Sequence, residues 1–221
     1  MKPVIIINFK TYPAATGKQA VKLAALCEQM GRDFDVDVRV AVQATDIYHV
    51  AEAVSIPVYA QHVDPVEAGK TTGWTTVGAI KAAGASGSLV NHAEHQLDTA
   101  HIKVAVAQLR KAKLDACVCA ESIERLHELN DVKPTFLCVE PPELIGGDVS
   151  VSVANPEIIK HAVHAAQYPL LVGAGVKKHK DVDIALELGA QGVLLASGIV
   201  CAKHWEKAFK KLLHKNMNRV A

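Results

Sequence analysis

The chain of 221 residues has no long hydrophobic run near its start and no excess of one charge. The longest apolar run there, Val4 to Ile7, is far too short for a signal peptide or a membrane span. We therefore expect a cytoplasmic protein that does not bind membranes. The 24 basic and 23 acidic residues leave a formal net charge of +1. Because this balance creates no general attraction for polyanions, we expect no binding of nucleic acid.

Cysteine is scarce, and its count of five is odd. Without a secretory signal, an odd count argues against a disulfide framework. Cys117 and Cys119 lie two residues apart in an expected strand, and Cys138 lies in the next one, where small thiols fill a hydrophobic core. We expect all five cysteines to be structural.

Metal and nucleotide motifs are also missing. The pairs His92/His95 and His161/His164 lack a second ligand pair at a familiar spacing, so we expect no metal. The tripeptide Gly69-Lys70-Thr71 lacks the earlier glycine of a P-loop, because Asp64 stands in that place. The turn after the first expected strand has no glycine either, which disfavours a dinucleotide-binding sheet. We expect no cofactor.

The chain does have a regular alternation of short apolar segments and longer segments with helical periodicity or helix-start signals. The expected strands are 4–8, 36–42, 57–61, 87–91, 114–119, 134–139, 170–173 and 192–196. The expected helices are 18–30, 45–53, 75–83, 98–111, 122–129, 156–167, 180–188 and 203–214, with glycine stops at Gly31, Gly84 and Gly189. This pattern fits about eight strand-helix units, in an open doubly wound sheet or a closed barrel.

Polar residues gather where the expected strands end, which favours the barrel because its chemistry lies at the carboxyl ends of its strands. About eight similar units in roughly 200 residues also suit a barrel. We predict an α/β fold, a single (β/α)8 barrel domain over residues 1–221. The polar residues at strand ends are Asn8, Lys10, Gln61, His92, Glu94 and Glu140.

Glu140 lies directly after the apolar run 135–139 and before two prolines and a pair of glycines. The prolines end the strand, and Gly146 and Gly147 leave the following loop free to move. A carboxylate on a rigid strand end, under a loop that is first stiff and then flexible, suits a general base beneath a movable lid.

Two loops near the end of the chain are rich in small residues, at 172–175 and 195–198. Each presents backbone N–H groups near a helix start, where anions bind. Either loop alone suits a tight turn. In barrels, however, the loops after strands seven and eight often bind phosphate, so two such loops together predict a phosphate site.

Taken in order, these motifs resemble the triosephosphate isomerase family, in particular its shorter archaeal-type branch. The resemblance runs over essentially the whole chain. It implies a TIM barrel that interconverts glyceraldehyde 3-phosphate and dihydroxyacetone phosphate in glycolysis and gluconeogenesis. The residues that carry it are Asn8-x-Lys10, Asn91-His92-Ala93-Glu94, Glu140 to Gly146, Gly173-Ala174-Gly175 and Leu195-Ala196-Ser197-Gly198.

The same resemblance implies a role for each catalytic residue. Glu140 removes a proton from one substrate carbon and returns it to the next, through an enediolate. Neutral His92 polarises the carbonyl oxygens. Lys10 supplies a fixed positive charge, and Glu94 is expected to hold it in a buried ion pair.

For substrate binding, the resemblance implies that Asn8 contacts the substrate beside Lys10. Ile145 belongs to a lid over about residues 140–150. Backbone N–H groups of Gly173, Ala196 and Ser197 donate to the phosphate.

Three positions depart from the family pattern. Ala93 stands where a serine usually holds the base while the lid is open, so the resting place of Glu140 is in question. The lid reads Gly147-Asp148 instead of Thr-Gly, and we expect its carboxylate to oppose closure over a phosphate dianion. His95 replaces a usual arginine, which predicts a weaker charge network around Glu94.

The segment 69–74 resembles the loop through which subunits of this family interlock, with Thr72 reaching into the partner. A large side chain such as Trp74 beside it suits an interface. The resemblance implies a homodimer or a homotetramer.

Two other functions remain open from the sequence. One is a phosphate-binding aldolase with Lys10 as a Schiff base. The other is a sugar-phosphate binder without catalysis, suggested by Ala93 and Asp148. The presence of Glu140, His92 and Lys10 together argues against both.

Overall fold

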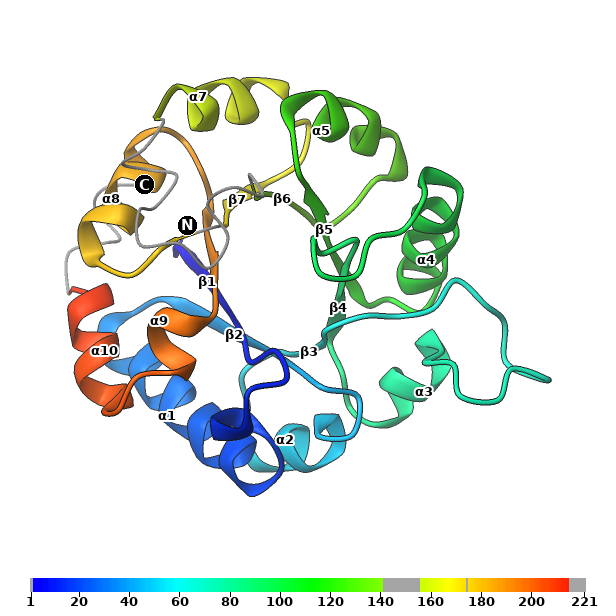
Figure 1. The fold of residues 1–221 in the computed structure, drawn as a ribbon, viewed down its shortest axis with the longest axis horizontal. Coiled ribbons are helices and arrows are strands. Elements are labelled where there is room, and N and C mark those ends of the chain that lie inside the picture. Colours follow the sequence, from blue (N-terminus) through cyan, green and yellow to red (C-terminus); the bar gives the residue numbers. More distant parts are fainter. Residues whose placement is uncertain (1, 141–155, 174, 215–221) are drawn as a thin grey trace.

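Parallel strands close into a barrel in which each strand pairs with its neighbours in the chain and β8 returns to β1 (Figure 1). The computed structural model describes residues 2–140, 156–173 and 175–214. Closure brings β8 so near β1 that a Cβ on Gly192 would lie 1.8 Å from the Val4 carbonyl oxygen. The strands within these residues are β1 (Val4–Asn8), β2 (Asp37–Val42), β3 (Val58–Ala60), β4 (Gly87–Val90), β5 (Asp115–Ala120), β6 (Phe136–Val139), β7 (Leu170–Val172) and β8 (Gly192–Leu195).

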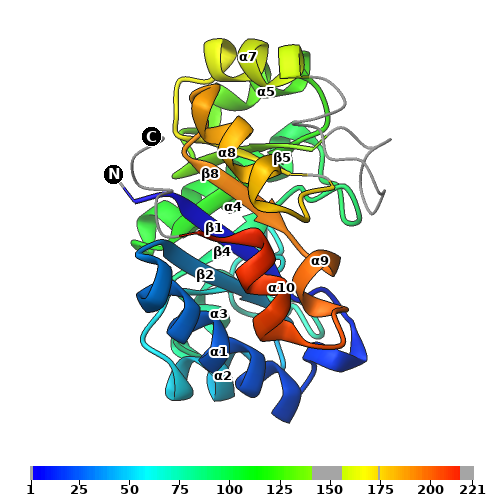
Figure 2. The same cartoon turned by 90° about the vertical axis from the view of Figure 1, so that its left-hand side faces the viewer.

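Helices surround the barrel, and α9 lies beyond the carboxyl end of β8 (Figures 1 and 2). Among the described residues, no helix is both long enough and apolar enough to cross a membrane. The helices are η1 (Pro13–Ala15), α1 (Lys18–Phe34), α2 (Ile47–Ala53), α3 (Val77–Ala82), α4 (Thr99–Lys111), α5 (Ile123–Leu129), η2 (Asn130–Val132), α7 (Pro156–Ala165), α8 (His179–Glu187), α9 (Ser197–Val200) and α10 (Trp205–Leu212).

The predicted α/β barrel is confirmed, and the expected strands and helices agree with the structure to within a few residues at their ends. Gly84 and Gly189 end helices with positive φ, as expected. The stop at Gly31 is wrong, because α1 runs on to Phe34 and ends at Asp35, which adopts the left-handed conformation itself. Gly31 instead lets the helix approach β2, since a Cβ there would lie 3.2 Å from Val38.

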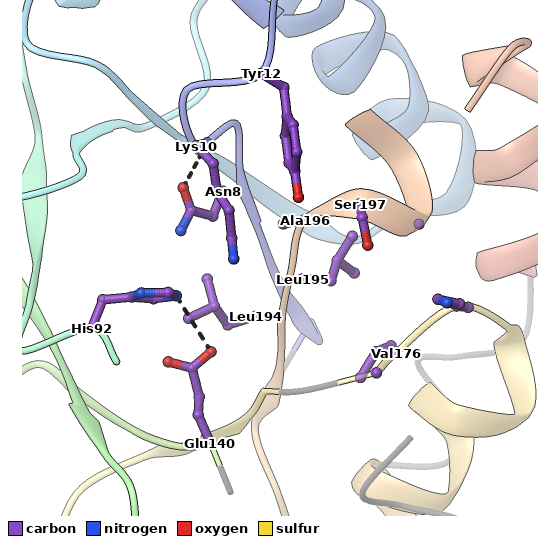
Figure 3. A pocket seen from close by; sticks show the side chains of 13 residues that line it. Asn8, Lys10, Tyr12, His92, Glu140, Val176, Leu194, Leu195, Ala196 and Ser197 are labelled. Carbon is purple, nitrogen blue, oxygen red and sulfur yellow. Dashed lines mark hydrogen bonds and ion pairs between the residues drawn. The ribbon is translucent and has the colours of Figure 1, made fainter. Parts of the chain in front are cut away.

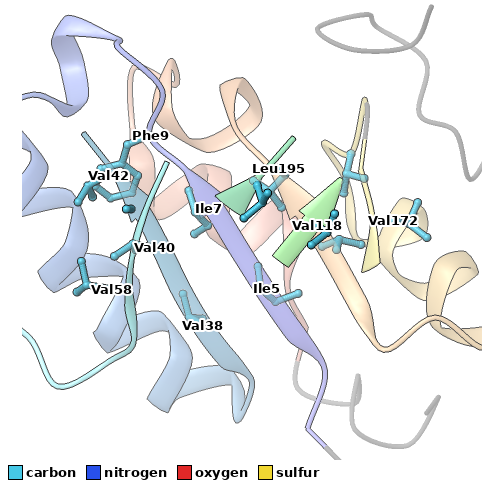
Figure 4. Close-up of a cluster of buried hydrophobic side chains, with 14 of the residues drawn as sticks. Ile5, Ile7, Phe9, Val38, Val40, Val42, Val58, Val118, Val172 and Leu195 are labelled. Carbon is cyan, nitrogen blue, oxygen red and sulfur yellow. The ribbon is translucent and has the colours of Figure 1, made fainter. Parts of the chain in front are cut away.

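Two hydrophobic cores hold the barrel. One fills the space between the strands and the helices, where Ile5, Ile7 and Val40 are fully buried (Figure 4). The other fills the inside of the barrel and includes Leu89 and Leu194. Because both faces of the strands are covered, they read as continuous apolar runs instead of alternating patterns.

The cysteines are all free, and Cys27, Cys117, Cys119 and Cys138 are buried as expected. Cys117, Cys119 and Cys138 lie in the core inside the barrel. Cys201 is exposed, so the expectation of a structural thiol is wrong for this residue, which follows the last turn of α9 at the surface.

Candidate functional site

A pocket opens at the carboxyl mouth of the barrel (Figure 3). Its walls come from the ends of β1 and β6, the turn after β4, and the loops after β7 and β8, so segments far apart in the chain meet there. Of the predicted site residues, the structure brings Asn8, Lys10, His92, Glu140, Ala196 and Ser197 to this pocket.

Lys10 takes an unusual backbone conformation just past the end of β1. Its φ of +47° lies in the left-handed region, which costs free energy for any residue with a Cβ. Two hydrogen bonds hold it there. The Lys10 N–H donates to Asn8 Oδ1 at 2.9 Å, and Gln61 Nε2 donates to the Lys10 carbonyl at 2.8 Å. Asn8 and Gln61 therefore fix the direction in which the lysine side chain leaves the strand.

The Lys10 ammonium pairs with Glu94 as predicted, with Nζ 2.5 Å from Oε1. The expectation of a buried pair is wrong for the carboxylate. The Lys10 side chain is 14% exposed, whereas that of Glu94 is 56% exposed. Glu94 lies in the surface turn after β4, so its carboxylate keeps much of its hydration and the desolvation cost falls mainly on the lysine.

His92 is buried, and its hydrogen bonds indicate its tautomer. The backbone N–H of Glu94 donates to Nδ1 of His92 at 3.1 Å. A ring nitrogen that accepts a hydrogen bond carries no proton, so in the neutral ring the proton is on Nε2. Nε2 lies 3.7 Å from Oε1 of Glu140 (Figure 3). The imidazole thus presents an N–H donor towards the carboxylate and the pocket.

Asn91 fastens the turn that carries His92. Its φ of +60° turns the chain sharply after β4, a conformation that asparagine tolerates better than most residues. The Asn91 side chain donates to the Cys119 carbonyl on β5 and accepts from the Leu97 N–H, both at 2.9 Å. The sequence reasoning did not single out this contribution of Asn91.

Glu140 is almost fully buried, yet one of its oxygens has no hydrogen-bond partner among the described residues. That atom is Oε2, and the side chain is only 6% exposed. A buried carboxylate oxygen without a partner is costly and marks a functional site. Ala93 offers no hydroxyl to hold the carboxylate away from the pocket, and Glu140 lies beside His92 instead.

Gly173 leaves space for the Glu140 side chain and does not line the pocket. A Cβ on Gly173 would lie 2.4 Å from Cγ of Glu140, so only glycine leaves room for the carboxylate. The Gly173 N–H already donates to the Val139 carbonyl at 2.9 Å within the barrel. The predicted donation from Gly173 to a phosphate is therefore wrong. The need for glycine comes from the neighbouring strand, which a local sequence motif does not reveal.

Ala196 and Ser197 line the pocket at the start of α9. The first N–H groups of a helix have no partner within the helix, so those at the start of α9 are placed to bind an anion.

Tyr12 also points into this pocket (Figure 3). The sequence reasoning missed Tyr12, although its place two residues after Lys10 in a strand-end loop could have suggested it.

His95, which replaces a usual arginine, stacks on His62 with ring centroids 3.7 Å apart. His62 Nε2 lies 3.3 Å from Asp64 Oδ1. Burial and the neighbouring His95 lower the pKa of His62, against the opposing effect of Asp64. Together with Glu94 and Lys10, the two histidines line a second hollow beside the main pocket.

Other predicted residues lie apart from the pocket or outside the described residues. Ile145 and the lid beyond Glu140 belong to the segment 141–155, which the structure does not describe. Thr72 is exposed, and Trp74 is 54% exposed, in the segment between β3 and α3 that projects away from the barrel (Figure 1).

Known proteins resemble this chain over nearly its whole length. The family model described as triosephosphate isomerase matches residues 3–215. Triosephosphate isomerase of Methanothermus fervidus is 43% identical, over 96% of this chain and 98% of the relative. That of Archaeoglobus fulgidus is also 43% identical, over 95% of this chain and 96% of the relative. A crystal structure of triosephosphate isomerase from Bartonella henselae has a TM-score of 0.72 at 20% identity, over 99% of this chain and 100% of that one, and supports the fold alone.

Proposed function

Since the chain belongs to the triosephosphate isomerase family, we propose that it interconverts glyceraldehyde 3-phosphate and dihydroxyacetone phosphate. The observation that carries the proposal is the meeting of three groups at one mouth of the barrel. Glu140 and His92 lie 3.7 Å apart, and Lys10 lines the same pocket. A base, a hydrogen-bond donor and a fixed positive charge are the groups that proton transfer next to a carbonyl requires.

In this proposal Glu140 takes the proton from the carbon next to the carbonyl. Its oxygen that has no hydrogen-bond partner in the described part of the chain supports the role, because a base must have a free lone pair for the proton. The resulting enediolate carries negative charge on the oxygens. The His92 Nε2–H donates a hydrogen bond to them, and Lys10 stabilises the charge. The protonated Glu140 then returns the proton to the neighbouring carbon.

The phosphate is proposed to lie against the start of α9, where Ala196 and Ser197 line the pocket. A dianion there gains from several backbone N–H groups and from the positive end of the short helix. Asn8 is proposed to contact the substrate beside Lys10. Ile145 stays a proposed lid residue, within a lid that shields the enediolate from water.

The decisive test is a coupled assay of the isomerase reaction, comparing the wild type with Glu140→Asp. Shortening the base by one methylene should lower kcat on the order of a hundredfold or more, with little change in substrate binding. Glu124→Asp, on the exposed first turn of α5, is the matched control and should leave the rate unchanged. Equal rates for wild type and Glu140→Asp would remove Glu140 from the mechanism.

A Schiff-base aldolase is disfavoured because Lys10 is paired with Glu94. A lysine nitrogen held in an ion pair is not free to attack a carbonyl carbon. Borohydride treatment in the presence of a triose phosphate separates the two chemistries. A covalent adduct on Lys10 would favour the aldolase, and saturable binding without turnover would favour a binder without catalysis.

We also propose that residues 1–221 form one barrel domain and assemble into a homodimer or a homotetramer. The exposed Trp74 and Thr72, in a segment that projects from the barrel, support an interface there. Light scattering of the active enzyme tests this, because an active monomer would refute it. A cytoplasmic location stays a prediction from the sequence.

A further inference from the structure

Two thiols lie against the buried carboxylate at the mouth of the barrel. Cys119 on β5 and Cys138 on β6 are paired in register, and Glu140 follows two residues after Cys138 on the same inward face. The two sulfur atoms and a carboxylate oxygen of Glu140 all lie within 4.8 Å of one another. All three residues are buried. Among the described residues, no other group of three such side chains comes as close together.

The proposed isomerase reaction uses only one of these three groups. A proton transfer between neighbouring carbons needs a carboxylate and no thiol. If Cys119 and Cys138 only filled the core beside Glu140, alanine would serve as well, and it would bring no sulfur atom to the carboxylate. Two sulfurs and an oxygen around one point are instead a donor set for a thiophilic divalent cation.

We propose that Cys119, Cys138 and Glu140 form a binding site for a thiophilic divalent cation of the Zn²⁺ or Cd²⁺ class, and that the bound cation inhibits the enzyme. The oxygen of Glu140 that has no hydrogen-bond partner within residues 2–140, 156–173 and 175–214 is a second observation in favour of a ligand. The inhibition rests on the proposed function of Glu140, whereas the binding does not.

The geometry suits such an ion after small side-chain rotations. Bonds of about 2.3 Å to sulfur and about 2.0–2.2 Å to oxygen place the ligands of a tetrahedral ion roughly 3.5–3.8 Å apart. The present separations are at most 4.8 Å, so closing the site takes movements of about 1 Å. On binding, each thiol releases its S–H proton to solvent, the carboxylate contributes an oxygen lone pair, and no electron is transferred.

The site borders a small hollow that is too narrow for a water molecule, so a cation enters only when the surrounding side chains move. This hollow, beside the main pocket, is lined by Cys119, Glu140 and Ala93. Ala93 brings only a methyl group to this wall, where a longer or polar side chain would crowd or occupy the carboxylate. A cation held here occupies the lone pairs of Glu140 and so removes the base from the proposed reaction.

The binding is tested with Cd²⁺, whose thiolate complexes absorb in the near ultraviolet, in a Cys201→Ser background that removes the exposed thiol. We expect one Cd²⁺ per chain with the absorbance of two thiolates. Cys138→Ala should halve the absorbance and weaken the binding of Cd²⁺ at least about a hundredfold. Loss of a residue that only supports a metal ligand can already cost about that much, and Cys138 is a ligand itself. Cys138→Ser, which keeps the size of the side chain, should behave in the same way and controls for a packing defect.

Cys117→Ala is the matched control. Cys117 is equally buried inside the barrel, two residues earlier on β5, but it is not one of the three clustered ligands. This variant should keep the Cd²⁺ absorbance, the affinity and the inhibition. The isomerase rate is measured in parallel, each variant relative to its own rate without metal, and a chelator should restore it.

The outcomes separate the two proposals. Cd²⁺ absorbance that depends on Cys138, in a protein without isomerase activity, would support the metal site and refute the proposed function. An active enzyme that shows no thiolate absorbance, or whose absorbance is the same with and without Cys138, would overturn the metal site. Binding without inhibition would overturn the role of Glu140 as a ligand.

Discussion

The two ends of the barrel differ in how well their buried polar groups are satisfied. At the carboxyl end, Lys10 and Asn91 have left-handed backbones, and Glu140 has a buried oxygen without a hydrogen-bond partner among the described residues. At the amino end, the guanidinium of Arg39 is surrounded by partners. Unsatisfied groups are kept where they can act on a ligand, and the cost is tolerated because the rest of the barrel is well packed.

The cluster at the amino end is a closed network. Arg39 donates to Asp37 at 2.7 Å and to Asp115 at 2.8 Å. The Tyr59 hydroxyl donates to the same oxygen of Asp115 at 2.7 Å, and the guanidinium lies 4.9 Å from the centre of the Phe136 ring. Burial raises the pKa of Tyr59, so its hydroxyl stays a donor. Such a network holds the strands together, and each of its charged groups is paired with another member of the network.

The largest expected effect at the carboxyl end comes from Gly173→Ala. The added methyl group would displace Glu140, which lies 2.4 Å from the position of that Cβ. A displacement of about 1 Å should lower kcat on the order of a hundredfold, equal to about 2.7 kcal/mol in the barrier. Steady-state kinetics measure this. Gly78→Ala on α3, where the nearest atom is 3.9 Å away, should keep the wild-type rate. Unchanged turnover in Gly173→Ala would contradict the packing argument.

At the amino end, Arg39→Met should act on stability and not on turnover. It leaves Asp37 and Asp115 without their cation, and because these carboxylates are 30% and 35% exposed, we expect a loss of about 2 kcal/mol, below the range for fully buried pairs. Urea unfolding at fixed protein concentration measures it. The control Arg32→Met removes the pair between the exposed Arg32 and Glu28, which keeps a backbone hydrogen-bond donor in Ser55, and should cost less than about 0.5 kcal/mol. A slower enzyme with full stability would reverse this assignment.

A smaller effect is expected for Glu94→Gln. Lys10 loses a partner that is half exposed and screened by solvent, so kcat/KM should fall only about tenfold, mainly through the position of the ammonium. Kinetics at low and high salt measure it, because a charge effect weakens with added salt. Glu124→Gln, also exposed, is the control. A loss as large as that of Glu140→Asp would mean that Glu94 itself takes part in the chemistry.

The smallest effect concerns pH and His62. Its pKa is lowered in the folded protein by burial and by His95, so as the pH falls the unfolded chain takes up this proton first. The free energy of unfolding should therefore decrease as the pH drops from about 6.5, the ordinary value for histidine. His62→Asn should flatten this dependence in urea unfolding between about pH 7.5 and 5.5. An equal slope in both proteins would show that His62 does not contribute.

The sequence predicted the order of the elements because a barrel repeats one strand-helix unit, and each unit leaves a local pattern. It predicted the site where a polar residue interrupts an apolar run, as at Asn8, His92 and Glu140. Those interruptions mark strand ends, and closed barrels bring the strand ends to a common mouth.

The contacts that depend on the inward face of a strand were not predicted. The strands β5 and β6 are apolar on both faces, so their composition does not tell which residues point inside. Counting back in twos from Glu140 would have placed Cys138 on its face. The clash that requires Gly173 could not be found in this way, because it involves a neighbouring strand more than thirty residues away.

The clamp that Asn91 makes has a consequence for how the site works over a catalytic cycle. Its two hydrogen bonds tie the histidine-bearing turn to β5 on one side and to the approach to α4 on the other. The Nε2–H donor of His92 is thus held in a fixed direction by the barrel before a substrate binds. This wall of the pocket is therefore fixed by hydrogen bonds to the barrel, and His92 needs no rearrangement of its turn to keep its direction.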